Sequence, residues 1–161
     1  MRKYFLTLFF AFATISIHAQ TESFDVFTYQ APEFFSKSEL QSGVQFNLTN
    51  KDGSFCTIAL YSSQPAKADV IKDVASQWSK QVVKRWGKAD KKPARVLTEQ
   101  LWDGWVSTLA IGNFYYGKRK CIVMLNSFRK DQTSACAVFA FSDKIFKGPV
   151  ENFSRNLHLK L

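Results

Sequence analysis

The residue types that most enzymes use for acid–base, nucleophilic or metal chemistry are few in this sequence. It contains two histidines, His18 and His158, and three cysteines. It carries no G-x-S-x-G, H-E-x-x-H or C-x-x-C motif and no glycine-rich phosphate loop. A catalytic triad or a multi-histidine metal site would depend on His158 alone once the segment around His18 is removed, as argued below. We therefore expect no catalytic residues, no metal site and no cofactor.

The aspartates lie where structural roles explain them. Asp52, Asp103 and Asp131 fall in expected turns, in which aspartate hydrogen-bonds to nearby backbone N–H groups. Asp69 and Asp73 fall early in an expected helix, where a negative charge stabilises the positive end of the helix dipole. Carboxylates from separate strands can still meet in a folded chain. A small hydrolase is therefore the alternative to a non-catalytic protein.

Aromatic and basic residues gather around two expected turns and could form a ligand-binding patch. Aromatic faces beside cations suit a sugar, a peptide or an anionic ligand. Consecutive strand residues point to opposite faces of a sheet, so we expect at least half of these rings in the core. The candidates for ligand binding are the members at turns: Trp102, Tyr116, Lys118 and Arg119. The wider cluster also contains Trp105, Phe114, Tyr115 and Lys120.

The N-terminus has the layout of a secretory signal peptide. Arg2 and Lys3 precede an uncharged, mostly apolar run over residues 4–17, and Ala19 offers a small residue for cleavage. This run is shorter than the roughly 20 apolar residues that a membrane-spanning helix needs. We expect residues 1–19 to be removed, the protein to be exported to the periplasm or the medium, and the mature chain to contain no transmembrane segment.

The chain is strongly basic, with 22 Lys and Arg against 13 Asp and Glu in 161 residues and a formal net charge of +9. Part of this charge lies in a basic run between Lys80 and Arg95. An exported protein meets little nucleic acid, so nucleic acid is not an expected partner. Acidic lipid headgroups or polysaccharide would suit such a run better. The alternative is a solvated surface that serves solubility.

Residues 20–161 are long enough for one domain and show both helix and strand periodicity. Apolar side chains every three to four residues predict a helix over residues 65–87, and Pro149 opens a second helix. The pair Asp52-Gly53 supplies the positive φ that a tight hairpin needs. Alternation and turn signals predict strands over residues 24–29, 43–49, 55–61, 94–101, 105–114, 120–128 and 134–141.

This order of three strands, a helix, four strands and a helix predicts an α+β fold. Hairpins between consecutive strands imply an antiparallel sheet of about six to seven strands. Each helix has one apolar stripe, which must be buried on that sheet. We therefore expect a single-domain α/β sandwich of the order βββαββββα that exists as a monomer.

The order of elements and several short segments resemble the PsbP-like fold. The segments are residues 27–32, 55–61, 102–105 and 150–153, together with the helix around Trp78. This family includes extrinsic subunits of the plant oxygen-evolving complex and many small exported bacterial proteins. The chain looks most like an uncharacterised exported bacterial group with this architecture. The resemblance implies a fold and a mostly non-catalytic, accessory or binding role, and it transfers no active-site residue.

Three cysteines in an oxidising compartment allow one disulfide and leave one thiol over. In the expected hairpin around residues 130–131, Cys121 and Cys136 lie four residues out of register, roughly 13 Å apart and beyond the ~7 Å limit between Cα atoms. We expect a Cys56–Cys136 disulfide, which the resemblance also favours and which requires neighbouring strands. The alternative is three buried free thiols.

These observations favour a binding or accessory module of the cell envelope that contacts a protein, a glycan or an anionic ligand. The competing class is the small hydrolase with carboxylates from separate strands. A third option is a structural envelope protein with no ligand of its own.

Overall fold

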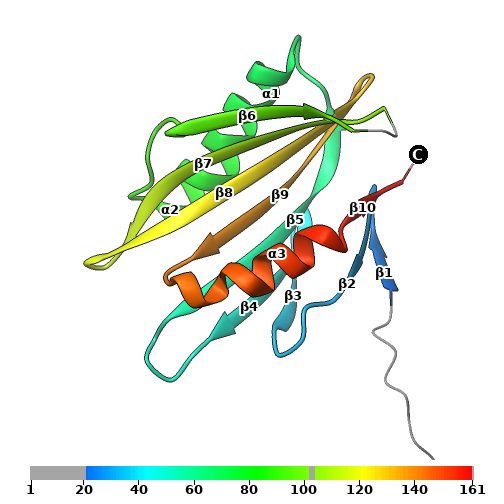
Figure 1. The fold of residues 1–161 in the computed structure, drawn as a ribbon. Helices are drawn as coiled ribbons and strands as arrows, with labels where there is room; N and C mark the ends of the chain where they lie inside the picture. Colours follow the sequence, from blue (N-terminus) through cyan, green and yellow to red (C-terminus); the bar gives the residue numbers. More distant parts are fainter. Residues whose placement is uncertain (1–20, 102–103, 161) are drawn as a thin grey trace, which may run out of the picture.

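A seven-stranded antiparallel sheet runs through the middle of the molecule (Figure 1). The computed structural model describes residues 21–101 and 104–160, and within them the strand order of this sheet is β3-β4-β5-β9-β8-β7-β6. The strands are β3 (Ser36–Leu40), β4 (Gly43–Thr49), β5 (Phe55–Pro65), β6 (Arg95–Gln100), β7 (Val106–Tyr116), β8 (Arg119–Lys130) and β9 (Thr133–Phe141).

A second, three-stranded sheet brings the two ends of the described chain together. Its central strand, β2 (Phe27–Gln30), pairs with β1 (Thr21–Phe24) on one side and with β10 (His158–Leu159) on the other. The helices are α1 (Val70–Trp78), a π-helical turn (Ser79–Val83) that continues into α2 (Lys84–Trp86), a 3₁₀ turn (Lys144–Phe146) and α3 (Lys147–Arg155).

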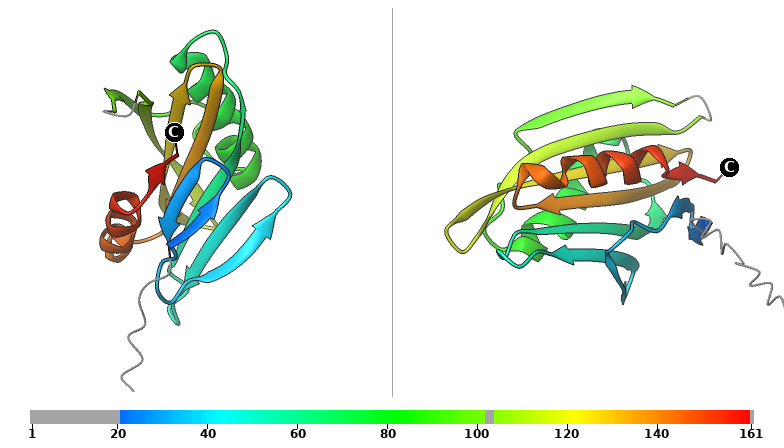
Figure 2. Two further views of the ribbon diagram at one scale, coloured as in Figure 1. Left: turned by 90° about the vertical axis from the view of Figure 1, so that its right-hand side faces the viewer. Right: turned by 60° about the horizontal axis from the view of Figure 1, so that its bottom comes forward.

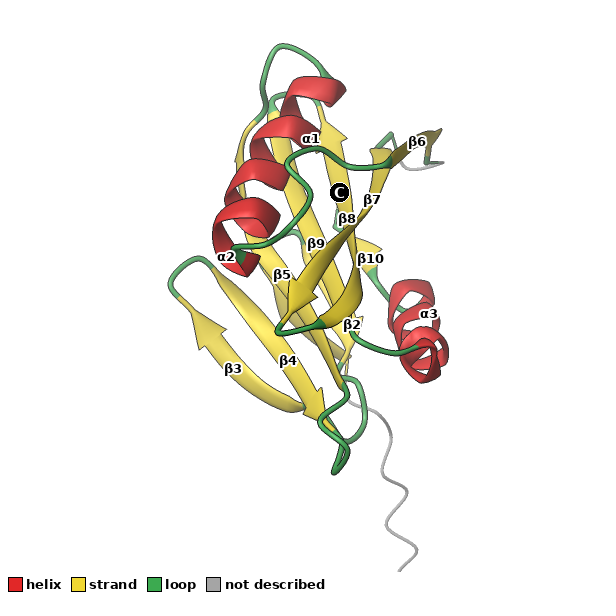
Figure 3. Ribbon diagram, turned by 90° about the vertical axis from the view of Figure 1, so that its left-hand side faces the viewer, coloured by secondary structure: helices red, strands yellow, loops and turns green. Residues whose placement is uncertain are grey.

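The helices α1 and α3 cover opposite faces of the seven-stranded sheet (Figures 2 and 3). On one face, α1 and the π-helical turn bury Val74, Trp78 and Val82 against the sheet. On the other face, Phe153 of α3 packs with Tyr29 of the three-stranded sheet over the same strands. The predicted α+β sandwich with one main antiparallel sheet is confirmed.

The strand β9 lies at the centre of the sheet and is buried on both sides. Cys136 and Val138 face α1, whereas Ala137 and Phe139 face α3. A strand covered on both faces needs an almost continuous apolar sequence rather than an alternating one. The segment Thr133–Phe141 has such a sequence, and eight of its nine residues are buried.

The first predicted helix begins five residues later than expected, because β5 continues to Pro65 and α1 starts at Val70, whereas its end before Gly87 is as predicted. The carboxylate of Asp69 caps α1 by accepting the N–H of Lys72 at 2.8 Å, and Gly87 adopts a positive φ of 63° where α2 ends. The second helix begins at Lys147, two residues before Pro149. Proline is tolerated anywhere in a first helical turn, because the N–H groups there have no intrahelical partner.

The N-terminal strand prediction is wrong in detail. Residues 24–29 do not form one strand, because Asp25 adopts a positive φ of 49° and splits the segment into the β1–β2 hairpin. The strands β3 and β10 also lie outside the predicted set. By contrast, the predicted hairpin at Asp52-Gly53 is confirmed: Gly53 has a φ of 76°, and Asp52 accepts the N–H and hydroxyl of Ser54.

The predicted Cys56–Cys136 disulfide is not formed, and all three cysteines are buried free thiols. Their strands are neighbours as required, but Cys56 pairs with Phe141 and Cys136 with Tyr61. The five-residue offset corresponds to roughly 17 Å along the strand at ~3.4 Å per residue, far beyond the ~7 Å that a disulfide allows between Cα atoms. The two thiols also belong to opposite faces of the sheet.

Alkylation should distinguish the folded from the unfolded protein. Burial raises the pKa of Cys56 and of Cys136 to about 12 and raises that of Cys121 as well. Because the thiolate is the reactive form, iodoacetamide at pH 8 should leave all three thiols unmodified in the native protein. In denaturant without reductant, intact-mass spectrometry should show three adducts. A single adduct under denaturing conditions would contradict the absence of a disulfide.

Candidate functional site

Four aromatic rings meet at the end of the main sheet where β7 turns into β8. They belong to Phe55 at the start of β5, Trp86 at the end of α2, and Phe114 and Tyr116 near the end of β7. The ring centroid of Trp86 lies 4.6 Å from that of Phe114 and 6.4 Å from that of Phe55. The centroids of Phe55 and Tyr116 are 5.2 Å apart. Such spacings are typical of attractive aromatic pairs, so the rings form one contiguous cluster.

The segment after α2 holds Trp86 in this cluster. Gly87 ends the helix with a positive φ, which lets the chain turn back along β7. The backbone N–H of Tyr115 then donates to the carbonyl of Lys88 at 3.1 Å. This contact ties the chain after α2 to the end of β7, and it keeps the indole of Trp86 against Phe114.

An open cleft of about 330 Å³ lies beside these rings, lined by Phe55, Trp86 and Tyr116 on its aromatic side. We call it the aromatic cleft. Its other side is polar and is formed by Asn47, Thr49 and Thr57, and the hydroxyl of Thr57 donates to Oδ1 of Asn47 at 3.0 Å. Apolar rings beside a few oriented polar groups are typical of small-ligand sites.

The indole N–H of Trp86 is an unusual feature of the aromatic cleft. It is buried and has no hydrogen-bond partner within the described part of the chain. More than nine in ten buried polar groups in proteins have such a partner, so an exception needs an explanation. A ligand in the cleft could reach this nitrogen only if the side chains that cover it moved.

Two exposed cations lie next to the aromatic cleft, in the turn between β7 and β8. Lys118 and Arg119 follow Gly117, whose positive φ of 61° allows the tight turn. The β4–β5 turn lies at the same end of the sheet, because the starts of β5 and β8 both pair with the end of β9. The two hydrogen bonds that Asp52 of that turn accepts from Ser54 lower the pKa of its carboxyl, and the charge of Arg119 lowers it further.

The residues predicted for ligand binding are placed as follows. Tyr116 is 65% exposed at the edge of the aromatic cleft, with Lys118 and Arg119 beside it. Trp102 lies outside the described residues. Trp105 and Phe114 are core side chains, as expected for part of the cluster.

Phe55 and Trp86 were not among the predicted ligand-binding residues. Trp86 belongs to the helical stripe that the periodicity assigns to the core, and Phe55 lies in an ordinary strand pattern. The position of Trp86 could have indicated a partly exposed ring: it is the last residue of the stripe and directly precedes the glycine that ends the helix.

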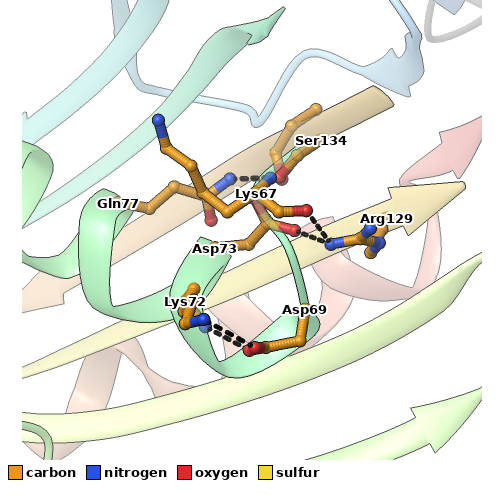
Figure 4. Close-up of polar contacts among 8 residues, drawn as sticks. Lys67, Asp69, Lys72, Asp73, Gln77, Arg129 and Ser134 are labelled. Carbon is orange, nitrogen blue, oxygen red and sulfur yellow. Dashed lines mark hydrogen bonds and ion pairs between the residues drawn. The ribbon is translucent and has the colours of Figure 1, made fainter. Parts of the chain in front are cut away.

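A second polar group of residues fastens α1 to the sheet (Figure 4). The carboxylate of Asp73 is 1% exposed and accepts the guanidinium of Arg129 at 2.7 Å and the backbone N–H of Lys67 at 2.7 Å. The amide of Gln77 donates to the hydroxyl of Ser134 at 2.7 Å. Because Arg129 neutralises the buried carboxylate, this arrangement serves structure rather than proton transfer.

Two aspartates line another surface cleft, of about 420 Å³, together with Lys160 and Trp105. They are Asp25, between β1 and β2, and Asp131, between β8 and β9. Both are exposed turn residues with a positive φ of 49°. The carboxylate of Asp25 accepts the backbone N–H of Ser63. Both side chains are open to solvent.

Within residues 21–101 and 104–160, no group of three His, Cys, Asp or Glu side chains comes together to hold a metal ion. The helices in those ranges are all too short or too polar to cross a lipid bilayer.

Comparison with known proteins identifies the fold. No family model and no curated protein matches the chain. The solution structure of cyanobacterial PsbP (CyanoP) from Synechocystis sp. PCC 6803 is similar to it with a TM-score of 0.60 at 10% identity, over 92% of this chain and 97% of that one. A crystal structure from Bacteroides thetaiotaomicron VPI-5482 matches with a TM-score of 0.49 at 14% identity, over 84% of this chain and 46% of that one. The chain has the PsbP-like fold, and identities this low carry no function.

Proposed function

We propose that this chain with a PsbP-like fold is an exported, non-catalytic binding protein of the cell envelope that holds a glycan in the aromatic cleft. The observation that carries the proposal is that the rings of Phe55, Trp86 and Tyr116 line one cleft together with the polar side chains of Asn47, Thr49 and Thr57. Export rests on the signal-peptide pattern of residues 1–19.

A sugar ring fits this arrangement because it has an apolar face of C–H groups and an edge of hydroxyl groups. The apolar face would lie on Tyr116 or Trp86, and the hydroxyl groups would exchange hydrogen bonds with Asn47 and the threonines. A cleft of about 330 Å³ has the size of a small-ligand pocket. A stable protein interface would instead bury about 800 Å² on each partner.

The basic turn selects among glycans. Lys118 and Arg119 are exposed beside the aromatic cleft, and Asp52 is the carboxylate in electrostatic contact with Arg119. Carboxylate or phosphate groups on a glycan would gain charge-assisted hydrogen bonds there. We therefore expect acidic oligosaccharides to bind more tightly than neutral ones of the same length, and added salt to reduce the difference.

Substitution of Tyr116 tests the proposal. The Tyr116→Ala variant should lose about tenfold in affinity for the best oligosaccharide of an acidic and neutral panel, measured by calorimetry, because the exposed ring supplies stacking area. Tyr115→Ala is the matched control: Tyr115 is 47% exposed but points to the other face of β7, and its loss should change affinity less than twofold.

Two results would contradict the glycan proposal. One is equal loss of affinity in the Tyr116→Ala and Tyr115→Ala variants, which would place the ligand elsewhere. The other is the absence of binding to every oligosaccharide in the panel.

A hydrolase is the second candidate, because Asp25 and Asp131 line one cleft together with Lys160. The two aspartates come from separate turns, as a carboxylate pair assembled by the fold would. Purified protein assayed on chromogenic glycosides and esters would decide the matter. Turnover that disappears in both Asp25→Asn and Asp131→Asn would replace the binding proposal with this one. Asparagine suits both positions, because it tolerates a positive φ as aspartate does.

A further inference from the structure

A second hollow, of about 480 Å³, lies between α1 and the chain that leads into β6, away from the aromatic cleft. We call it the α1–β6 groove. Its helix side is formed by Ile71, Val74, Ala75 and Trp78, and its other side by Lys91, Lys92, Pro93 and Val96.

The groove follows from the spacing of residues on α1. Positions i, i+3, i+4 and i+7 share one face of a helix, so Ile71, Val74, Ala75 and Trp78 form a single stripe. Val74 and Trp78 are 3% and 1% exposed and form the base, while Ala75 is too small to fill the space between its larger neighbours. The stripe therefore continues past the covered core into an open apolar hollow.

The far side of the groove is also left uncovered. β6 is an edge strand, and Val96 remains 40% exposed there. Across the hollow, Ile71 on the helix is 59% exposed. Removal of these large apolar side chains from water lowers the free energy, so an apolar ligand that covers them would bind favourably.

The charges around the groove have one sign. Lys91 and Lys92 lie on its wall next to Pro93, and among the described residues no carboxylate lines it. The nearest acids along the chain are engaged elsewhere: Asp69 with Lys72, Asp73 with Arg129, and Asp90 with the backbone and side-chain amides of Asn113. The groove thus combines an apolar stripe with two neighbouring ammonium groups on the facing wall.

We propose that the α1–β6 groove binds a single-chain amphiphile with a carboxylate head, such as a long-chain fatty acid. The alkyl chain lies on Ile71, Ala75 and Val96, and the carboxylate pairs with Lys91 and Lys92. A peptide in the same groove could pair with the edge of β6 on one side only, and its remaining backbone N–H and C=O groups would lie against apolar side chains, where each unpaired group costs free energy. An alkyl chain carries no such groups.

Titration of the mature chain, residues 20–161, with monomeric laurate by calorimetry tests this proposal. Burial of one methylene group contributes about 0.8 kcal/mol, so each methylene removed from laurate should weaken binding by up to about fourfold. Decanoate, which is two methylenes shorter, measures this effect. Dodecanol, which has the chain but no charge, should bind about tenfold more weakly than laurate.

Two variants connect binding to the groove. Ala75→Trp fills the hollow from an exposed position on α1 and should abolish laurate binding. Lys91→Glu/Lys92→Glu should reduce laurate affinity at least tenfold and dodecanol affinity less than twofold. The matched control, Lys80→Glu/Lys84→Glu, makes the same change in net charge at exposed residues beyond the groove and should leave laurate binding unchanged.

Other occupants give different results. Binding to vesicles of anionic phospholipid without binding of monomeric laurate would overturn the proposal and indicate a membrane-docking face. Unchanged laurate affinity in Ala75→Trp would also overturn it. Since Tyr116 lies outside this groove, the Tyr116→Ala variant should bind laurate normally, so failure of one proposal is distinguishable from failure of the other.

Discussion

Replacement of Trp78 by alanine should lower the free energy of unfolding by about 4 kcal/mol, the largest loss expected for a single substitution in α1. Trp78 is 1% exposed, and its indole N–H donates to the carbonyl of Asp90 at 2.8 Å. Its ring lies directly over Gly112 of β7, where an added Cβ would come within 2.8 Å of the ring. Alanine would leave a cavity between α1 and the sheet and an unpaired carbonyl. Urea denaturation followed by far-ultraviolet circular dichroism measures the loss.

Two further variants separate the role of the Trp78 ring from that of the helix. Ile71→Ala removes a 59% exposed side chain from the same stripe and should cost less than about 1 kcal/mol. Gly112→Ala crowds Trp78 from the opposite side and should cost about 1–3 kcal/mol. A loss below about 1 kcal/mol for Trp78→Ala would contradict the packing described for α1.

Substitution of Asp73 by alanine should cost about 3 kcal/mol, because it removes one partner of a buried ion pair. The side chain of Asp73 is 1% exposed and that of Arg129 is 19% exposed, so part of the guanidinium keeps its contact with water. The N–H of Lys67 would also lose its acceptor. The start of α1 would then be held to β8 by fewer contacts. Chemical denaturation gives the change in stability.

The neighbouring Asp69 provides the control for this prediction. It lies in the same turn of the chain but is half exposed and only caps the helix, so Asp69→Ala should cost about 1 kcal/mol. The double variant Asp73→Ala/Arg129→Met removes both charges and should be more stable than Asp73→Ala alone, since no unpaired cation is left. Equal losses for Asp69→Ala and Asp73→Ala would show that the ion pair contributes nothing.

The parts of the fold that carry their own signal could be predicted from the sequence. The β4–β5 hairpin follows from Asp52-Gly53, and the helix from the stripe through Trp78. The central strand β9 follows from its nearly unbroken apolar run. In each case the residues that define the pattern are also the residues that the element buries or places in its turn.

The elements that were not predicted are those that carry no clear pattern of their own in the sequence. β3 has four exposed residues out of five and no alternation, because it is an edge strand held by its pairing with β4. β10 is a two-residue strand that exists through β2. The positive φ of Asp25 leaves no mark in an alternating pattern.

The candidate site was predictable only in part, because two of its rings are brought to it by long-range strand pairing. Tyr116, Lys118 and Arg119 could be assigned to a turn from local sequence. Phe55 and Trp86 join them only because the strand order β5-β9-β8-β7 brings the ends of β5 and β7 to one end of the sheet. The predicted cysteine pairing was wrong because it depends on the register between β5 and β9, which local sequence does not reveal.

The pairing of β2 with β10 has a consequence for the order in which the molecule can assemble. His158 lies opposite Thr28, and the N–H of Lys160 donates to the carbonyl of Val26 at 2.7 Å. The seven-stranded sheet and α1 are formed within residues 36–141, whereas this small sheet needs segments from the two ends of the described chain. We therefore expect it to close after the main sheet, because contacts between distant parts of a chain form late.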